Sequence, residues 1–296
     1  MEIRVLRYFL AVAKEQSISR AAQALHLSQP TLSRQLMDLE TELGKQLMIR
    51  GTRRLTLTEE GVLLRKRAEE IIDLVDKTEA EIKAADDKIS GDVLIGAGET
   101  DAMRLIAEVA KRLSDEYPDI HMHVFSGNAE EVTEKLDKGL IDFGLLIEPV
   151  SAAKYESIRL PATDTWGLLM RKDSPLAEKE FVEIEELYGL PLICSKQVYS
   201  NPKEFYKLFK IDIGGLNIVS TYNLIFNASI MAEEGLGYAL CLDKLIKTPD
   251  DGALCFRPIY PSLEVKLDVV WKKNQVFSKA SELFLNRLRE TYGGDK

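Results

Sequence analysis

Residues 17–40, SISRAAQALHLSQPTLSRQLMDLE, leave few options for their fold, because two short helical patterns flank a tight polar break. Leucines recur from Leu32 to Leu43 at spacings of four, three and four, so at about 100° per residue they form one stripe of a helix. Ser28 offers this helix a cap, and Pro30 lies in its first turn, where a missing N–H costs little. The pattern predicts two helices joined by a turn.

The outer face of the second helix is polar and partly basic, as in a helix-turn-helix whose second helix enters the major groove of DNA. On that face Gln29 can read adenine, Arg34 can read guanine or bind a phosphate, and Ser33 can contact either base. An ordinary helical pair with a solvated polar face fits the same pattern. This segment alone therefore leaves both interpretations open.

The next segment, QLMIRGTRRLTLT, reads as two short strands joined through Gly51, with arginines at the tip. A basic hairpin directly after such a helix is typical of a wing, whose arginines enter the minor groove or bind phosphate. The alternative is a solvated turn with incidental arginines. Charge favours the wing, since residues 1–54 carry nine Lys or Arg and five Asp or Glu, whereas the whole chain has a net charge of −9.

Residues 59–89 are predicted to form one long helix, because Thr58 with two glutamates behind it suits a helix start. Apolar or small side chains then alternate at spacings of four and three, which is a heptad pattern. So narrow a stripe packs either on the chain's own body or on the same helix of a second chain. The residues predicted for a seam between two chains are Leu64, Ala68, Ile71, Val75 and Ile82.

After residue 90 the pattern changes to buried strands that alternate with amphipathic helices. DVLIGAG, IHMHVF and IDFGLLI predict strands, with helices over residues 102–117 and 129–138 between them. A second set begins near Trp166 and includes GLLM, LPLIC, NIVSTY and GYALCL. Repeated strand–helix–strand units predict parallel sheets with helices on both faces.

The segment AAQALHLSQPTLSRQLMDLETELGKQLMIRGTRRLTLTEEG resembles the winged helix-turn-helix of LysR-type transcriptional regulators, in register from Leu6 to about Gly61. Met48 stands where the family usually has Phe, which is a change in packing. EYPDIHMHVFSGNAEEVTEKLDKGLIDFGLLI and EEGLGYAL extend the resemblance over nearly the whole chain, and the second lobe matches only loosely. The residues expected to face DNA are Ser28, Gln29, Pro30, Thr31, Ser33, Arg34, Arg50, Arg53 and Arg54.

The resemblance implies an α/β protein overall, with a winged helix-turn-helix over residues 1–58 and a linker helix over residues 59–89 that pairs two chains. Residues 90–296 would form a two-lobed α/β regulatory domain that resembles periplasmic binding proteins. Its lobe I is expected to comprise residues 90–163 and 264–296, and its lobe II residues 164–263.

The resemblance also implies partners: a double-stranded DNA operator, a small-molecule effector, and further copies of the chain in a tetramer built as a dimer of dimers. RNA polymerase is a further candidate partner, and no cofactor, metal or membrane contact is expected. The apolar runs are too short to span a bilayer, and we recognise no signal peptide. Three cysteines without CxxC spacing fit a reducing compartment, so we expect the cytoplasm.

Ligands of open α/β sheets bind beyond the carboxyl ends of strands, where helix N-termini offer free N–H groups. The resemblance implies an effector pocket at these same strand ends. A Ser, Thr or Asn there also serves as an ordinary helix cap, so the convergence of four loops is the stronger argument. The residues predicted for the pocket are Gly98, Glu99, Thr100, Ser126, Gly127, Asn128, Ser200, Asn201, Tyr222 and Asn223.

Two acids, Glu99 and Asp101, flank Thr100 in the first of these loops. In a pocket they would repel a second anion, although many family members bind carboxylate inducers at this helix start. We therefore expect a neutral, zwitterionic or cationic ligand, or none. The alternative is that the acids stabilise the helix dipole and never meet a ligand.

Other chemistry has weaker support in the sequence. His121 and His123 share one strand face and could chelate a metal, but no cysteine or cluster of acids stands near them to add ligands. Redox sensing by Cys194, Cys241 or Cys255 would need a low-pKa environment, and the first two lie in apolar strands. No phosphate loop, nucleophile elbow or paired-carboxylate motif indicates an enzyme. A cytoplasmic two-lobed solute-binding protein is the main alternative, but it has no use for wing arginines.

Overall fold

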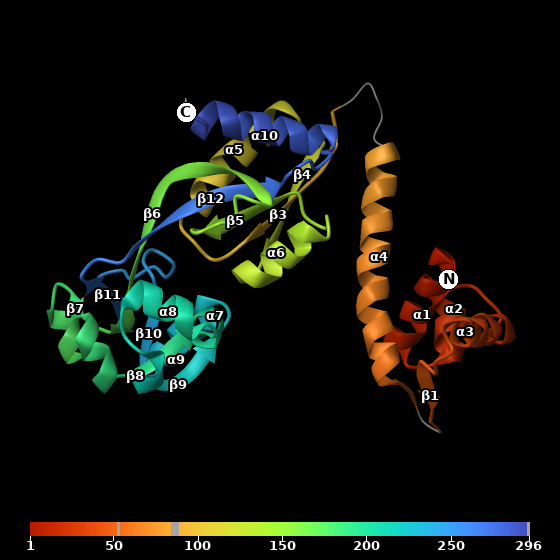
Figure 1. Cartoon of the computed structure of the whole chain (residues 1–296), viewed down its shortest axis with the longest axis horizontal. Helices are drawn as coiled ribbons and strands as arrows, with labels where there is room; N and C mark the ends of the chain where they lie inside the picture. Colours follow the sequence, from red (N-terminus) through yellow and green to blue (C-terminus); the bar gives the residue numbers. More distant parts are fainter. Residues whose placement is uncertain (52–53, 84–88, 295–296) are drawn as a thin grey trace. The chain divides into compact units, whose positions relative to one another are not determined.

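The computed structural model describes residues 1–51, 54–83 and 89–294. The chain divides into two units, residues 1–83 and 84–296, which we call the head and the body. Figure 1 shows the elements of both units. Within the described ranges, every helix lacks the combination of length and apolarity that crossing a bilayer requires.

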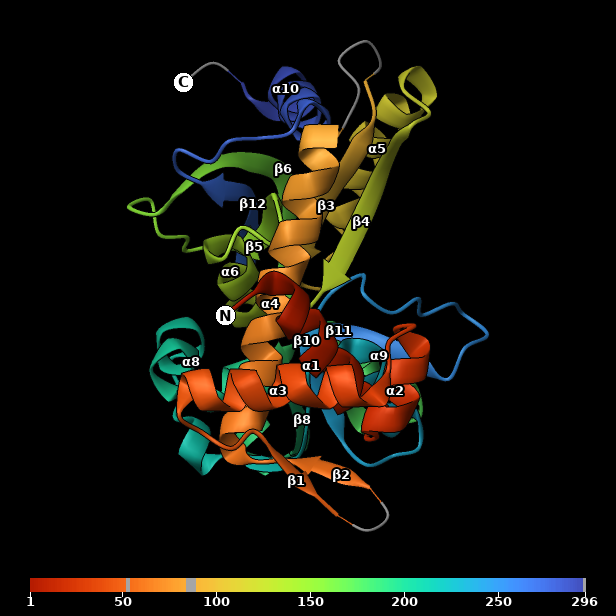
Figure 2. The same ribbon diagram turned by 90° about the vertical axis from the view of Figure 1, so that its right-hand side faces the viewer.

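Helices and a short hairpin make up the head, which Figure 2 shows with the third helix toward the reader. Its elements in chain order are α1 (Ile3–Glu15), α2 (Ile18–Ala24), α3 (Gln29–Leu43), β1 (Met48–Arg50), β2 (Leu55–Leu57) and α4 (Glu59–Lys83). Phe9, Leu32 and Leu36 are fully buried in one apolar core, and Met48 and Leu55 of the hairpin pack into the same core. The leucine stripe of α3 therefore faces inward, as its spacing predicts.

Local sequence explains where the first helices begin and end. Ser17 Oγ accepts from Arg20 N at 3.4 Å, and Ser28 Oγ accepts from Thr31 N at 3.3 Å, so each hydroxyl caps one helix. Helix α3 ends at Gly44, whose φ of 63° lies in the left-handed region that glycine adopts without strain. The predicted helix-turn-helix is present, with a polar cap at one end of α3 and a glycine at the other.

Lobe I of the body is a sheet with helices on both faces. Its elements are β3 (Gly91–Ala97), α5 (Met103–Glu116), β4 (Ile120–Ser126), α6 (Ala129–Asp137), β5 (Phe143–Ile147), β12 (Glu264–Lys272) and α10 (Lys279–Tyr292). Strand β3 lies between β4 and β5 and is parallel to both. Val93 and Ile95 face the core shared with α5 and α10, and Leu94 faces the cluster under α6. Figure 1 shows α5 and α10 on one side of this sheet and α6 on the other.

Lobe II repeats this plan around a second core. Its elements are η1 (Pro175–Glu178), β7 (Val182–Glu183), η2 (Ile184–Gly189), β8 (Pro191–Ser195), α7 (Lys196–Ser200), α8 (Pro202–Phe209), η3 (Ile213–Gly215), β9 (Asn217–Tyr222), α9 (Ile225–Glu233), β10 (Tyr238–Leu242) and β11 (Leu254–Tyr260). Strand β8 lies between β9 and β10 and is parallel to both. Phe205 and Phe209 of α8 pack on one face, and Ala228 and Ala232 of α9 pack on the other.

One strand, β6 (Tyr155–Arg171), belongs to both lobes. It pairs with β12 in lobe I and with β10 and β11 in lobe II, and all three pairings are antiparallel. The predicted parallel order therefore holds within each strand–helix repeat but is wrong for the strands that connect the lobes. Strand β6 leads the chain out of lobe I and β12 leads it back, so the two run in opposite directions side by side.

Candidate functional site

The N-terminal part of α3 presents polar side chains to solvent. Gln29, Pro30, Thr31 and Arg34 are all exposed. Ser28 is exposed as well, and its Oγ lies 2.7 Å from Thr31 Oγ1 in addition to capping the helix. The start of α3 thus offers a continuous polar surface above a buried leucine stripe, which is the arrangement that a groove-binding helix needs.

Ser33 departs from the prediction that it faces DNA, because only 8% of its surface is exposed. It lies about 100° around the helix from Leu32, at the edge of the stripe that packs into the core. The spacing of the leucines fixes the centre of the buried stripe but not its width. Ser33 therefore packs against the head, and Arg34, a further 100° around, points outward.

The basic side chains of the head differ in whether an acid balances them. Arg7 of α1 forms an ion pair with Asp76 of α4. Arg34 on α3 and Arg54 after the wing turn are exposed, and in the part of the chain that the structure describes no acid pairs with either. These two charges are therefore available to a polyanion. Two predicted contacts lie outside the described residues: Arg53 and the side chain of Arg50.

Hydrogen bonds tie the wing to the helix that precedes it. The carboxylate of Glu40, on α3, accepts from Leu47 N at 2.7 Å and from Met48 N at 3.1 Å. At the same open end of the hairpin, Thr58 Oγ1 donates to Gln46 O at 2.8 Å and so closes the two strands together. The wing and α3 are thus held at a fixed spacing within the head, as a two-part DNA-reading surface requires.

Helix α4 has one apolar face that is used inside the head. Ala68 and Ile72 are buried against Leu6 of α1, with Leu64 at the edge of the same cluster. Ala68 has no exposed surface, so it and Leu64 pack within the chain rather than in the predicted seam. The heptad pattern alone could not show that part of the apolar stripe of α4 packs on α1 within the same chain and that another part stays exposed.

A second apolar face of α4 is exposed. Leu63, Ile71, Leu74 and Ile82 are 59%, 36%, 42% and 79% exposed, and Val75 is partly buried between the two faces. At 100° per residue the four exposed side chains fall in a sector of roughly 100°. Of the predicted seam residues, Ile71 and Ile82 lie on this face.

A cavity of about 550 Å³ lies between the two lobes of the body. Loops from the carboxyl ends of β3 and β4 line it on one side, and loops that follow β8 and β9 line it on the other. Topology therefore brings together segments that are far apart in the chain. The predicted residues that line the cavity are Gly98, Glu99, Thr100, Gly127, Asn128, Asn201, Tyr222 and Asn223.

Ser126 and Ser200 were also predicted for the pocket, but both are exposed and neither lines the cavity. Ser126 is the last residue of β4, where successive side chains point to opposite faces, and Gly127 takes the position toward the cavity. Ser200 ends the single turn of α7, whose Gln197 lines the cavity instead. A strand-end rule identifies the loop but not which of its side chains points inward.

Glu99 reaches across the cavity to lobe II. Its Oε2 accepts from Ile225 N at the start of α9, at 2.5 Å. Burial raises the pKa of Glu99 from its ordinary value, and the hydrogen bond from Ile225 lowers it in part. Asp101 instead pairs with Arg104 in the first turn of α5, at 2.6 Å, and does not line the cavity. The two acids thus occupy different environments, and Glu99 is the one in the pocket.

Thr100 connects the loop after β3 to the shared strand β6. Its Oγ1 donates to Asp164 Oδ2 at 2.5 Å and accepts from Ala102 N at 3.1 Å. Asp164 is only 1% exposed. Burial raises the pKa of Asp164, the neighbouring Asp243 adds to this, and the hydrogen bond from Thr100 opposes it.

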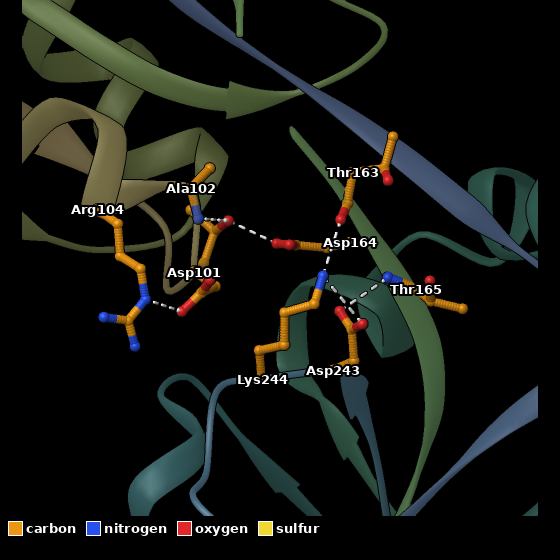
Figure 3. Close-up of polar contacts among 9 residues, drawn as sticks. Asp101, Ala102, Arg104, Thr163, Asp164, Thr165, Asp243 and Lys244 are labelled. Atoms are coloured by element: carbon orange, nitrogen blue, oxygen red, sulfur yellow. Dashed lines mark hydrogen bonds and ion pairs between the residues drawn. The ribbon is translucent and has the colours of Figure 1, made fainter. Parts of the chain in front are cut away.

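Lobe II holds the same stretch of β6 from the other side, as Figure 3 shows. Asp243 Oδ1 accepts from Thr165 N at 3.0 Å, and Lys244 Nζ donates to Thr163 O at 3.1 Å. Both residues follow β10, so the end of one lobe II strand is fastened to the connection between the lobes. The polar groups at this crossing come from both lobes.

Sequence reasoning missed most of the cavity wall, including Trp166, Ser195 and Gln197. Trp166 is 7% exposed, and among the described residues its Nε1 has no hydrogen-bond partner. Gln197 Oε1 accepts from Ala129 N, at the start of α6 in lobe I, at 3.4 Å. Ser195 and Gln197 come at or just after the carboxyl end of β8, so the strand-end rule could have found both. Trp166 lies within β6 and carries no such signal.

Tyr222 lines the cavity with its hydroxyl already engaged. The Tyr222 OH donates to Leu240 O at 2.8 Å. Burial raises the pKa of Tyr222 well above its ordinary value. The phenol therefore stays neutral and fixed, and it contributes a rigid wall to the cavity.

The cysteines and histidines considered for redox and metal chemistry lie in different surroundings. All three cysteines are buried, and burial raises the pKa of Cys194 and of Cys241 to about 12, which disfavours the reactive thiolate. His123 Nε2 lies 3.2 Å from Asp92 Oδ1. Within residues 1–51, 54–83 and 89–294 no group of three or more His, Cys, Asp or Glu could hold a metal ion.

Comparison with known protein families gives matches to both parts of the chain. The family described as "LysR substrate binding domain" matches residues 86–293. The family described as "Bacterial regulatory helix-turn-helix protein, lysR family" matches residues 3–62. Together these matches span the helix-turn-helix with its wing, the first residues of α4 and almost all of the body.

Individual proteins extend the likeness over the full length. The chain is 28% identical to the uncharacterized HTH-type transcriptional regulator YfeR of Shigella flexneri over 97% of this chain and 93% of that protein. It is 30% identical to a probable RuBisCO transcriptional regulator of Synechocystis sp. over 96% of this chain and 84% of that protein. The solved structure of full-length CbnR complexed with its target DNA has a TM-score of 0.74 and 21% identity, covering 98% of this chain and 100% of that one. At this identity the structural likeness shows the fold alone.

Proposed function

Because the chain belongs to the LysR family of transcriptional regulators, we propose that it binds operator DNA through α3 and the β1–β2 wing, under control of a small molecule in the body's cavity. The observation that carries this proposal is the exposed start of α3, where Gln29 and Arg34 stand above a buried stripe and no acid among the described residues pairs with Arg34. Arg34 and, on the wing, Arg54 are both exposed basic groups of the same unit. DNA phosphates supply the missing negative charge.

The two exposed groups on α3 suit different tasks in the major groove. An amide such as that of Gln29 can make two hydrogen bonds to adenine, and a guanidinium such as that of Arg34 can do so with guanine. Arg54 on the wing would contact the backbone or the adjacent minor groove. Affinity for DNA then comes mostly from contacts with phosphates, and sequence specificity comes from α3.

Replacement of Arg34 by Ala tests the role of α3. If Arg34 reads a base, Arg34→Ala weakens binding to an operator selected from genomic fragments by about 1–3 kcal/mol and relaxes the base preference at one position. If it binds a phosphate, the loss is similar for all sequences and the salt slope of binding falls by about one. Fluorescence anisotropy over a range of salt concentrations distinguishes the two.

Arg104→Ala is the matched control, since Arg104 is exposed, lies in the body and is paired with Asp101. It removes the same charge from the chain and should leave operator affinity unchanged. Equal affinities for wild type, Arg34→Ala and Arg104→Ala would refute the proposed binding surface. Loss in both variants would show that net charge alone, and not the position of Arg34, governs binding.

Assembly is the second part of the proposal. LysR regulators bind DNA and oligomerise, and we propose that α4 pairs two copies of this chain through its exposed apolar face. The seam then consists of Leu63, Ile71, Leu74 and Ile82, while Leu64 and Ala68 serve the head. Two such dimers would form a tetramer. Paired heads raise the effective concentration of the second head at its half-site.

The double variant Ile71→Asp with Leu74→Asp should dissociate this seam, because two charges would enter an apolar contact. Light scattering gives the mass of the assembly. Val62→Asp is the control, since Val62 is 52% exposed on a different face of α4. If the double variant has the same mass as wild type, the interface between copies does not involve this face of α4.

Control by the effector follows from linkage. A ligand in the cavity can change DNA binding only if its affinity differs between two arrangements of the assembly. We propose no cofactor, a site of action at bacterial DNA in the cytoplasm, and RNA polymerase as a further partner. A thermal-shift screen of metabolites would identify the effector, because stabilisation grows with ligand concentration.

A further inference from the structure

Two side chains cross the cavity of the body and cap helices of the opposite lobe. Glu99 of lobe I accepts from Ile225 N, at the start of α9 in lobe II, at 2.5 Å. Gln197 of lobe II accepts from Ala129 N, at the start of α6 in lobe I, at 3.4 Å. Helix N-termini carry N–H groups without intrahelical partners and favour negative charge. The shorter of the two contacts is the charged one.

The two helices differ in what their own sequence provides. Helix α6 has a full capping box, in which Asn128 accepts from Glu131 N and the Glu131 carboxylate accepts from Asn128 N. Helix α9 begins after Leu224, which makes no side-chain cap hydrogen bond. The cap of α9 thus comes from Glu99, a residue more than a hundred positions earlier and in the other lobe.

Glu99 is held in this position by its neighbour. Thr100 is fixed to Asp164 of β6 at 2.5 Å and to Ala102 N at 3.1 Å, so the loop that carries Glu99 has little freedom. In the described part of the chain, no basic side chain forms an ion pair with Glu99. Its partner is the helix end alone, and burial accordingly raises the pKa of Glu99.

We propose that Glu99 is a built-in carboxylate ligand of the effector cavity: it occupies the N-terminus of α9 from across the cleft, holds the two lobes together, and leaves a cavity whose effector is not a carboxylate. The proposal rests on the cavity being the effector site, as argued above. An anionic ligand would compete with Glu99 for the same N–H group and would meet its charge at close range.

The charged side chains on the rest of the cavity wall are two acids, Glu148 and Glu204, and one base, Lys207, so with Glu99 the acids outnumber the base and favour an uncharged or cationic ligand. The second carboxylate oxygen of Glu99 has no hydrogen-bond partner among the described residues, so it can accept from a ligand amine or hydroxyl. Trp166 lies on the cavity wall with 7% of its surface exposed, and its Nε1 is buried without a hydrogen-bond partner among the described residues. Leu242, Val265 and Leu267 line the same space with apolar surface.

Chemical rescue tests the proposal. Glu99→Ala removes the carboxylate and leaves the start of α9 uncapped, so the thermal transition of the body should fall by about 2–4 °C. Acetate supplied in solution should restore most of this loss in a concentration-dependent way. Potassium chloride at equal ionic strength and acetamide, which has nearly the shape of acetate without its charge, should not. Wild type should show no specific response to acetate.

Three further variants serve as controls for this result. Asp101→Ala removes a carboxylate two positions away that does not line the cavity, so its transition should not respond to acetate. Glu99→Gln keeps an acceptor oxygen at the same reach and should show a smaller loss and no rescue. Glu99→Ser opens the same space with a small polar side chain, and it replaces Glu99→Ala if that variant does not fold.

Acetate stabilisation of Glu99→Ala alone supports the proposal. The proposal is overturned if acetate stabilises wild type equally. It is also overturned if acetate stabilises neither Glu99→Ala nor Glu99→Ser in folded form. Calorimetric binding of a simple dicarboxylate to wild type, with affinity unchanged by Glu99→Gln, overturns it too. Operator binding is measured on the same samples. A failure to bind DNA would count against the proposed function. It would not change what the acetate experiment says about the contact between Glu99 and α9.

Discussion

The head and the body of this protein build their binding surfaces in opposite ways. In the head, the surface consists of exposed residues within one short segment, namely Gln29, Pro30, Thr31 and Arg34, on a helix whose other side fills a core. In the body, the surface is a cavity whose walls come from the loops after four strands and from the connections between lobes. The first surface comes from one short segment of the chain, and the second exists only when two lobes meet.

This difference determines which forces hold each surface. The head relies on contacts between near neighbours in sequence, such as the Ser28 cap and the hydrogen bonds from Glu40 to the wing. The body relies on contacts between distant segments, such as Thr100 with Asp164 and Glu99 with Ile225. Local changes should therefore damage the head locally, whereas changes at a lobe contact should affect both lobes.

The largest expected effect tests whether head and body are independent. Phe9 is fully buried in the core of the head, so Phe9→Ala should destabilise the head by about 3–5 kcal/mol. Calorimetry should show the head transition moving down while the body transition stays in place. Phe284→Ala, which empties the core of lobe I, should do the reverse. A single transition that shifts in both variants would show that the head and the body unfold together and are not independent.

The next effect concerns the link between α3 and the wing. Glu40→Ala removes the acceptor for Leu47 N and Met48 N, which should cost the head roughly 1–3 kcal/mol. Operator binding should weaken as well, because the wing loses its fixed distance from α3. Glu40→Gln keeps one acceptor oxygen and should retain more of both properties. Loss of stability without loss of binding would mean that the wing does not contact DNA.

A smaller effect is expected at the cap of α3. Ser28→Ala removes the acceptor for Thr31 N and should destabilise the head by about 1 kcal/mol. Ser28→Asp restores an acceptor and places a negative charge near the positive end of the helix, so stability should recover. DNA affinity should not recover, since that charge would face phosphate. Recovery of both properties would place the start of α3 away from the backbone of DNA.

The smallest effect is a dependence on pH at the crossing between the lobes. The folded state raises the pKa of Asp164 above its ordinary value of 3.8 through burial, so the folded chain binds this proton more tightly than the unfolded chain. Its contribution to stability therefore falls as the pH rises from about 3.8 through the folded pKa, and stays low above it. Asp164→Asn removes this dependence and keeps an oxygen that can accept from Thr100.

Urea unfolding of wild type and Asp164→Asn at a series of pH values measures this term. The difference in the free energy of unfolding should shift in favour of the variant as the pH rises through that window and then remain constant. Other acids contribute equally to both proteins and cancel in the difference. A difference that is flat across the acid range would mean that Asp164 is not desolvated in solution.

The same contrast explains how far the sequence could predict the molecule. The limits of α3 follow from Ser28 and Gly44, because a cap and a left-handed glycine are local signals. The convergence of Glu99, Asn128 and Tyr222 follows from a topological rule about strand ends. These residues are far apart in the chain, yet a repeated fold unit was enough to bring them together.

The failures have physical reasons as well. Ser33 and Ala68 were assigned to outer surfaces because periodicity gives the centre of a buried stripe and not what covers its edge. Trp166 was missed because a cavity wall within a strand looks like ordinary core. Nothing local in the sequence shows that Glu99 caps α9, since that contact depends on how the two lobes approach each other.

Strand β6 has one more consequence. The chain passes between the lobes twice, along β6 and again just before β12, and these two passages lie side by side. Two paired strands resist sliding past each other more than they resist bending together, so we expect the lobes to move by bending at this crossing. A ligand that changed the relative position of the lobes would therefore do so mainly by changing the bend at this crossing.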